Sequence, residues 1–210
     1  MSVLAQKNIL IGVSGGIAAY KIPLLIRQLV KLKSNVKVVM TPSSKEFVTP
    51  LTLSTVSKND VFSEFTTEKN NNPTWNNHVE LAEWADIFII APGTSNTISS
   101  MASARCDNLL LACYLSSTCP VFVAPAMDLE MYKNTLNQTN IKKLVSNNTN
   151  VLPVGSGSLA SGLEGEGRML EPNEIIHYVE NKFKKSLPLN SLNFLITAGP
   201  THEKIDPVRY

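Results

Sequence analysis

Short apolar runs of five or six residues alternate with helical patterns along most of this chain. Runs of this kind suit parallel strands that are buried on both faces. Their alternation with helices is typical of an α/β fold, a doubly wound parallel sheet with helices on both faces. The predicted strands are Asn8–Val13, Asn35–Met40, Asp86–Ala91, Pro120–Ala124, Asn150–Val154 and Asn193–Thr197.

Three helices are predicted between and after these strands. The first, Gly16–Leu32, carries apolar residues near helical spacing, but its Pro23 lies beyond the first turn. Proline there removes a backbone donor, so the start of this helix is expected to be irregular or kinked. A short helix is expected at His78–Trp84, and a final one at Pro172–Lys185.

Two segments depart from the α/β pattern. The polar stretch Thr66–Asn77 predicts a mobile surface loop that leads into the short helix. The segment Gly155–Arg168 contains five glycines in fourteen residues. We expect it to form a flap and not an element of a sheet.

The length of 210 residues, 43% of them apolar, is enough for one full core and too short for two ordinary domains. We therefore expect one domain over residues 1–186. Residues 187–210 are expected to be a linker and the truncated start of a second α/β unit, because the strand there ends in a Gly-Pro turn with no helix after it.

Charge and composition exclude several classes of function. The formal charge is +2 and the 19 basic residues are scattered, which disfavours nucleic acid as a partner. No run reaches the roughly 18 apolar residues of a membrane span, so we expect a cytoplasmic protein with no membrane partner. The spacing of Cys106, Cys113 and Cys119 matches no metal-ligand pattern, which predicts no metal and reduced, mostly buried thiols.

A glycine-rich loop, GVSGG, joins the first predicted strand to the first helix. Glycines at such a junction let backbone N–H groups approach a phosphate at the start of a helix, although a plain tight turn also explains them. The second strand ends in Thr41, Ser43 and Ser44, where a dinucleotide site would carry an acidic residue. Hydroxyls suit phosphate, and either serine alone can also be a helix cap. A mononucleotide such as FMN fits both features better than a dinucleotide.

Three further segments carry candidate chemistry. His78 follows the polar stretch, and a lone histidine has both structural and catalytic interpretations. The sequences APGTSNT (residues 91–97) and PAMDLEMY (residues 125–132) follow strands at the carboxyl edge, where ligands of open α/β sheets bind. Met127 and Met131, four residues apart in the second of these, are also compatible with a core role.

Together these segments resemble the homo-oligomeric flavin-containing cysteine decarboxylases, which have Rossmann-like, flavodoxin-like folds. The likeness is strongest to the decarboxylase half of the bacterial phosphopantothenoylcysteine decarboxylase/phosphopantothenate–cysteine ligases. It rests on GVSGGIAAYK, NHVELAEWAD, APGTSNT, PAMDLEMY and SGLEGEGRM, and the tail ITAGPTHEKIDPVRY is similar to the start of the ligase half.

The resemblance implies FMN-dependent decarboxylation of 4′-phosphopantothenoylcysteine to 4′-phosphopantetheine in coenzyme A biosynthesis, by a trimer or a dodecamer of trimers. No ligase activity is expected from this chain. The implied catalytic residues are His78 and Ser161, and the implied substrate-binding residues are Met127, Asp128, Met131, Gly162 and Arg168. FMN would be bound by Ser14, Gly15, Gly16, Ile17, Ala18, Thr41, Ser43, Thr94, Ser95 and Asn96.

Two positions depart from the family pattern. Ser161 stands where relatives carry a proton-donating Cys, and a hydroxyl is a far weaker acid than a thiol. A relay through water, another donor, release of the oxidised enethiol product and an engineered Cys-to-Ser change all remain open. Asp128 stands where relatives carry Asn, and its carboxylate would repel a substrate carboxylate unless it is protonated, paired or turned away. We expect Ser161 and Asp128 to compensate one another.

Other functions remain as alternatives. A flavin prenyltransferase and a peptidyl-cysteine decarboxylase share this fold type, but neither needs the ligase-like tail. A non-catalytic flavin-binding regulatory subunit is the alternative from a different class. Such subunits usually carry long acidic extensions, which this sequence lacks.

Overall fold

A parallel six-stranded sheet forms the centre of the computed structural model, which describes residues 2–69, 72–185, 193 and 195–199. The strand order is β3-β2-β1-β6-β7-β8, and each strand is parallel to its neighbours. The α/β prediction is therefore confirmed. The strands are β1 (Asn8–Val13), β2 (Asn35–Met40), β3 (Val61–Phe62), β6 (Ile87–Gly93), β7 (Val121–Pro125) and β8 (Asn150–Val151).

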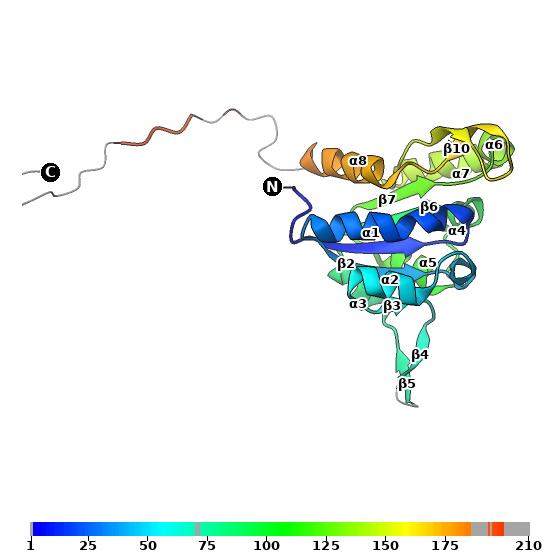
Figure 1. Cartoon of the computed structure of the whole chain (residues 1–210), viewed down its shortest axis with the longest axis horizontal. Coiled ribbons are helices and arrows are strands. Elements are labelled where there is room, and N and C mark those ends of the chain that lie inside the picture. The colour runs from blue at the N-terminus through cyan, green and yellow to red at the C-terminus, as the bar shows by residue number, and fades with distance from the viewer. Residues whose placement is uncertain (1, 70–71, 186–192, 194, 200–210) are drawn as a thin grey trace, which may run out of the picture.

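Helices cover both faces of this sheet, as Figure 1 shows. One face packs against α1 (Ile22–Lys31), α2 (Pro50–Ser57) and α8 (Pro172–Lys185). The other packs against α3 (His78–Trp84), α4 (Ser95–Ala102), α5 (Leu109–Ser116) and α7 (Thr135–Ser146). Alternate residues of β1 enter the two cores, so the strand has no polar face, which explains its uninterrupted apolar sequence.

Several predicted bounds agree with the structure. The strands β1 and β2 and the helices α3 and α8 begin and end where the sequence pattern placed them. The expected irregular start of the first helix is also confirmed. A 3-10 helix, η1 (Ile17–Lys21), precedes α1, and Pro23 is the second residue of α1, where its missing N–H breaks no helical hydrogen bond. The predicted strand Asn150–Val154 is shorter than expected, since β8 ends at Val151.

Two predictions of irregular structure were wrong. The stretch predicted as a loop forms a hairpin of β4 (Thr66–Lys69) and β5 (Asn72–Trp75), which projects away from the sheet (Figure 1). The glycine-rich flap is itself a two-stranded ribbon of β9 (Gly155–Ser158) and β10 (Glu164–Arg168). An antiparallel ladder is made by backbone groups, so polar and glycine-rich segments can pair without a strong strand pattern.

The predicted strand Asn193–Thr197 is not formed in the described part of that segment. Residues 195–199 have no regular secondary structure there, and the side chains of Leu195 and Ile196 are exposed. A strand needs a hydrogen-bonded neighbour, and no described residue pairs with these. The expected linker and most of the expected second unit lie outside the described residues, so the division at residue 186 stays a prediction.

Candidate functional site

A cavity of about 630 Å³ lies at the carboxyl ends of β1, β6 and β7. Its walls come from the glycine loop after β1, the loops after β6 and β7, and the β9–β10 flap. Four segments that are far apart in the sequence thus meet at one place. The predicted site residues that line the cavity are Gly15, Gly16, Ile17, Ala18, Thr94, Ser95, Asn96, Met127, Asp128, Met131, Ser161 and Arg168.

The glycine loop packs closely on its neighbours at two positions, and at Gly15 an added side chain would require its neighbour to move. A Cβ atom added to Gly15 would lie 2.5 Å from Ser43 Oγ, and one added to Gly16 would lie 3.0 Å from Thr94 Cγ2. The loop therefore presents backbone to the cavity. Ser43 and Thr41, whose hydroxyl oxygens lie 3.2 Å apart, do not line the cavity in this structure; Ser43 supports the loop at Gly15.

Ser14 also lies behind the cavity wall. Its buried hydroxyl donates to the carbonyl of Pro92 at 2.5 Å, and its oxygen accepts from the backbone N–H of Thr94 at 3.3 Å. Thr94 in turn caps α4 by accepting from the N–H of Thr97. Ser14 thus ties the loop after β1 to the loop after β6 and holds both segments at the cavity edge.

The loop after β7 leads into the short helix α6 (Leu129–Lys133), which Asp128 caps. Oδ1 of Asp128 accepts from the N–H of Leu129 at 2.8 Å and from the hydroxyl of Ser161 at 3.0 Å. The two residues that depart from the family pattern are therefore in contact. Met131 is 47% exposed and lines the cavity, so the core interpretation was wrong for this residue, whereas Met127 both lines the cavity and packs against the core on one face of the sheet.

The flap lies directly on this loop because of its glycines. The carbonyl of Gly167 accepts from the N–H of Met127 at 3.0 Å. Gly167 has φ +128°, and an added Cβ would lie 2.4 Å from the carbonyl oxygen of Met127. An added Cβ at Gly165 would lie 2.7 Å from Cδ1 of Leu129. The predicted residue Gly162 is at the turn of the flap with φ +86° and does not line the cavity.

His78 is not brought to the cavity within this chain. It is the first residue of α3 and packs edge-on against Phe65, with ring centroids 6.2 Å apart. Its Nδ1 is buried and has no hydrogen-bond partner among the described residues. The single chain therefore separates the two predicted catalytic residues.

Sequence reasoning missed two residues of the cavity that belong to the quoted motif GVSGGIAAYK. Tyr20 lies at its rim and is 57% exposed, while Lys21 is 3% exposed and reaches its wall. The Nζ of Lys21 donates to Glu171 Oε1 at 2.7 Å and to the carbonyl of Met169 at 3.0 Å. The signal that could have identified Lys21 is its place at the end of an otherwise apolar helical segment.

The cysteines are unpaired thiols in different surroundings. Cys106 is exposed, contrary to the expectation of mostly buried thiols, whereas burial raises the pKa of Cys113 to about 12 and also raises that of Cys119.

Over residues 2–69, 72–185, 193 and 195–199, no group of three or more His, Cys, Asp or Glu side chains could hold a metal ion. No helix in the described part of the chain is long and apolar enough to cross a membrane.

Comparisons with known proteins match this architecture. Residues 2–184 match the model of the flavoprotein family, and residues 189–210 match that of the DNA/pantothenate metabolism flavoprotein C-terminal domain. The coenzyme A biosynthesis bifunctional protein CoaBC of Bacillus subtilis (strain 168) is 41% identical over 210 residues, covering 99% of this chain and 51% of that protein.

A cysteine/cysteine sulfinic acid decarboxylase from an unknown prokaryotic organism is 48% identical over 167 residues, covering 78% of this chain and 46% of that protein. The chain thus spans about half the length of these curated relatives. Among solved structures, a Cys-to-Ser mutant of a PPC decarboxylase complexed with pantothenoylaminoethenethiol has a TM-score of 0.74. It is 33% identical, and the match covers 86% of this chain and 100% of that chain.

Proposed function

We propose that this chain, which belongs to the flavoprotein family, is an FMN-dependent decarboxylase that converts 4′-phosphopantothenoylcysteine to 4′-phosphopantetheine in coenzyme A biosynthesis. The observation that carries the proposal is one cavity that residues from four separate family motifs line together. The match to the flavoprotein model is followed by the match to the DNA/pantothenate metabolism flavoprotein C-terminal domain, which is the order expected of a decarboxylase half followed by a ligase half. This order favours the bifunctional relatives over single-function flavoproteins of the same fold.

The residues present fit FMN. The bare backbone of the glycine loop precedes η1, whose start carries no side-chain cap, so N–H groups are available to a phosphate. The hydroxyls of Thr94 and Ser95 and the amide of Asn96 supply hydrogen-bonding groups, and Ile17, Met127 and Met131 supply apolar surface for a ring system. A volume of about 630 Å³ is in the range of small-molecule sites, roughly 300–1,000 Å³.

Loss of CO2 from a cysteine-derived carboxylate leaves a carbanion that needs an electron sink. When bound, the flavin supplies an oxidant that turns the cysteine side chain into a thioaldehyde β to the carboxylate, which provides that sink. The protein's own residues position the substrate around it. Arg168 provides a cation at the cavity for an anionic group, and Met127 and Met131 supply apolar cavity wall for the substrate's carbon chain.

Ser161 and Asp128 act as one unit in this proposal. Because the Asp128 carboxylate caps α6 and accepts from Ser161, its charge is partly satisfied within the protein. The same hydrogen bond orients the Ser161 oxygen at the flap, where a proton has to be delivered to the product side chain. A serine hydroxyl is a weak donor, so we expect this final step to be slow.

His78 would complete the cavity of a neighbouring copy in a homo-oligomer, either a trimer or a dodecamer built from trimers. Two observations support this arrangement. The Nδ1 of His78 lacks a partner among the described residues, although it is buried. The cavity rim carries exposed apolar side chains at Ile17 and Tyr20, with Leu24 on the following turn of α1, and such patches mark interaction surfaces. A cytoplasmic location also stays a prediction.

The test is CO2 release by the purified chain loaded with FMN. We expect turnover of 4′-phosphopantothenoylcysteine and no comparable turnover of a peptide ending in cysteine. Free cysteine and cysteine sulfinic acid belong in the same assay because of the 48% identical relative. Faster turnover of either, or transfer of a prenyl group to FMN, would replace the proposed substrate. Flavin binding without any turnover would favour a regulatory subunit.

A further inference from the structure

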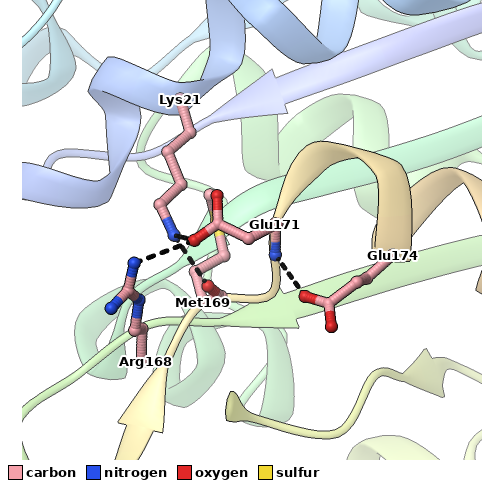
Figure 2. Close-up of polar contacts among 5 residues, drawn as sticks. All are labelled: Lys21, Arg168, Met169, Glu171 and Glu174. Carbon is pink, nitrogen blue, oxygen red and sulfur yellow. Dashed lines mark hydrogen bonds and ion pairs between the residues drawn. The ribbon is translucent and has the colours of Figure 1, made fainter. Parts of the chain in front are cut away.

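One carboxylate joins the end of η1, the 3-10 helix that follows the glycine loop, to the end of the flap, as Figure 2 shows. Oε1 of Glu171 lies 2.7 Å from Nζ of Lys21 and 2.9 Å from Nη2 of Arg168. We propose that Glu171 is a positioning residue that, through Lys21 and Arg168, fixes the flap over the cavity and orients Arg168 toward the substrate. This proposal rests on the proposed function and assigns the contact that controls substrate binding.

The three residues come from elements that the sequence separates widely. Lys21 is the last residue of η1, directly after the glycine loop, and Arg168 is the last residue of β10. Glu171 lies between β10 and α8, and α8 packs beside α1. The contact therefore connects two walls of the cavity that are far apart in the sequence, the segment after the glycine loop and the end of the flap.

The two partners of the Lys21–Glu171 ion pair differ in how deeply they are buried. The side chain of Lys21 is 4% exposed, whereas that of Glu171 is 48% exposed. The other hydrogen bond of Lys21 goes to the carbonyl of Met169, which is also at the base of the flap. Removing the carboxylate would leave a buried ammonium with one neutral acceptor, a state that costs free energy. The base of the flap would then shift until water reaches Lys21.

The guanidinium of Arg168 donates to the same oxygen of Glu171 as Lys21 does. Arg168 lines the cavity, and its guanidinium lies near the neighbouring flap strand, where an added Cβ on Gly157 would lie 3.7 Å from Nη1. The pairing with Glu171 holds one edge of the fork-shaped guanidinium, which leaves other N–H donors for an anionic ligand. Loss of Glu171 would release the Arg168 side chain, which should weaken substrate binding more than it slows the chemical step.

Glu174 provides a matched control. Its Oε2 accepts from the backbone N–H of Glu171 at 2.8 Å at the start of α8, and it does not contact the two cations (Figure 2). The variants Glu171→Gln and Glu174→Gln each remove one negative charge at nearly the same place. They differ in whether Lys21 and Arg168 lose their carboxylate partner.

The experiment measures amide hydrogen exchange of residues 155–169 and steady-state kinetics in the FMN-loaded 210-residue chain. We expect Glu171→Gln to raise exchange in the flap about tenfold, to raise KM about tenfold and to change kcat less than about threefold. Glu171→Asp should fall between this variant and the parent, and Glu174→Gln should match the parent. Unchanged flap exchange in Glu171→Gln would overturn the proposal.

A second variant keeps the test valid if Glu171→Gln does not fold. The double change Lys21→Met with Glu171→Leu replaces the ion pair by apolar side chains, which proteins often tolerate. It should fold and still show increased flap exchange, because Arg168 and the Met169 carbonyl lose their partners. Protection equal to the parent would also overturn the proposal. Hydrogen exchange needs no turnover. A parent chain without decarboxylase activity would therefore contradict the proposed function, while the exchange of the flap could still be compared between the variants.

Discussion

The hydroxyl of Ser161 donates to Oδ1 of Asp128 at 3.0 Å, joining the flap to the cap of α6. These are the two positions at which the family resemblance implies a departure from the usual residues. Their contact gives a physical basis for the expectation that they compensate one another. The Asp128 carboxylate accepts two hydrogen bonds from the protein, so it depends less on hydrogen bonds from the substrate than an unpaired carboxylate would.

Reverting both residues should give a non-additive change in kcat/KM. A thiol placed beside the Asp128 carboxylate has a raised pKa and donates poorly, so Ser161→Cys alone should gain little. With Asp128→Asn present, the same change should gain more. Because Ser161 is exposed, we expect a coupling near the low end of the usual range, about 0.5–1 kcal/mol. A four-variant cycle measures it, and additive effects would show that the two positions act separately.

Replacing His78 with Asn should leave FMN bound and abolish CO2 release, because the oxidation step would lose its base or orienting group. Equal turnover in variant and parent would return His78 to a structural role. A second variant, Gly16→Val, should block the cofactor loop, where an added Cβ already lies 3.0 Å from Thr94.

Co-expression of these two inactive chains then tests whether His78 serves a neighbouring copy. Random mixing should restore roughly a quarter of the sites, those with an intact loop and a neighbour's histidine. Recovered activity in the mixed oligomers would support the shared site. Mixed oligomers with no recovery would place His78 and the loop of the same chain in one site.

The flap should tolerate a methyl group on one strand and not on the other. Gly167→Ala places a Cβ 2.4 Å from the Met127 carbonyl at φ +128°, whereas Gly155→Ala meets its nearest atom at 3.5 Å. We expect Gly167→Ala to destabilise the flap by about 1–3 kcal/mol and Gly155→Ala to change it by less than about 1 kcal/mol. Native-state hydrogen exchange of residues 155–169 measures both. Equal effects would mean that the flap does not rest on the loop after β7 in solution.

Acid should release the flap through Glu171. The hydrogen bond from Lys21, followed by that from Arg168, lowers the pKa of the Glu171 carboxyl below its ordinary value of about 4.3. A lowered folded-state pKa stabilises the fold above about pH 4.3, and this contribution is lost as pH falls through the lowered value. The excess flap exchange of Glu171→Gln over the parent should therefore disappear in acid. An excess that persists at the lowest pH at which both chains stay folded would contradict this.

The central sheet and much of the cavity could be predicted because their signals are local. Buried strands such as β1 and β6 contain uninterrupted apolar runs, and the glycines of residues 15 and 16 mark a junction where backbone comes close to its neighbours. The flap was located by its glycines, but its two-stranded ribbon was missed. Backbone hydrogen bonds form that ladder, so the side-chain pattern of the sequence does not indicate it.

Contacts between distant segments could not be predicted in the same way. The ion pair of Lys21 with Glu171 joins positions 150 residues apart, and the bond of Ser161 with Asp128 depends on how the flap rests on α6. His78 shows the opposite case. Its motif was recognisable, but its place relative to the cavity depends on tertiary and subunit packing that a local pattern does not contain.

The proposed decarboxylation is tested most directly by anaerobic mixing of the FMN-loaded chain with 4′-phosphopantothenoylcysteine, with flavin absorbance followed in time and CO2 collected. We expect a fast loss of the oxidised-flavin bands together with CO2 release. Recovery should be slow in the parent and faster in the double variant Ser161→Cys with Asp128→Asn. A chain that takes up no FMN, or bound flavin whose absorbance stays constant while no CO2 appears, would contradict the proposed decarboxylation.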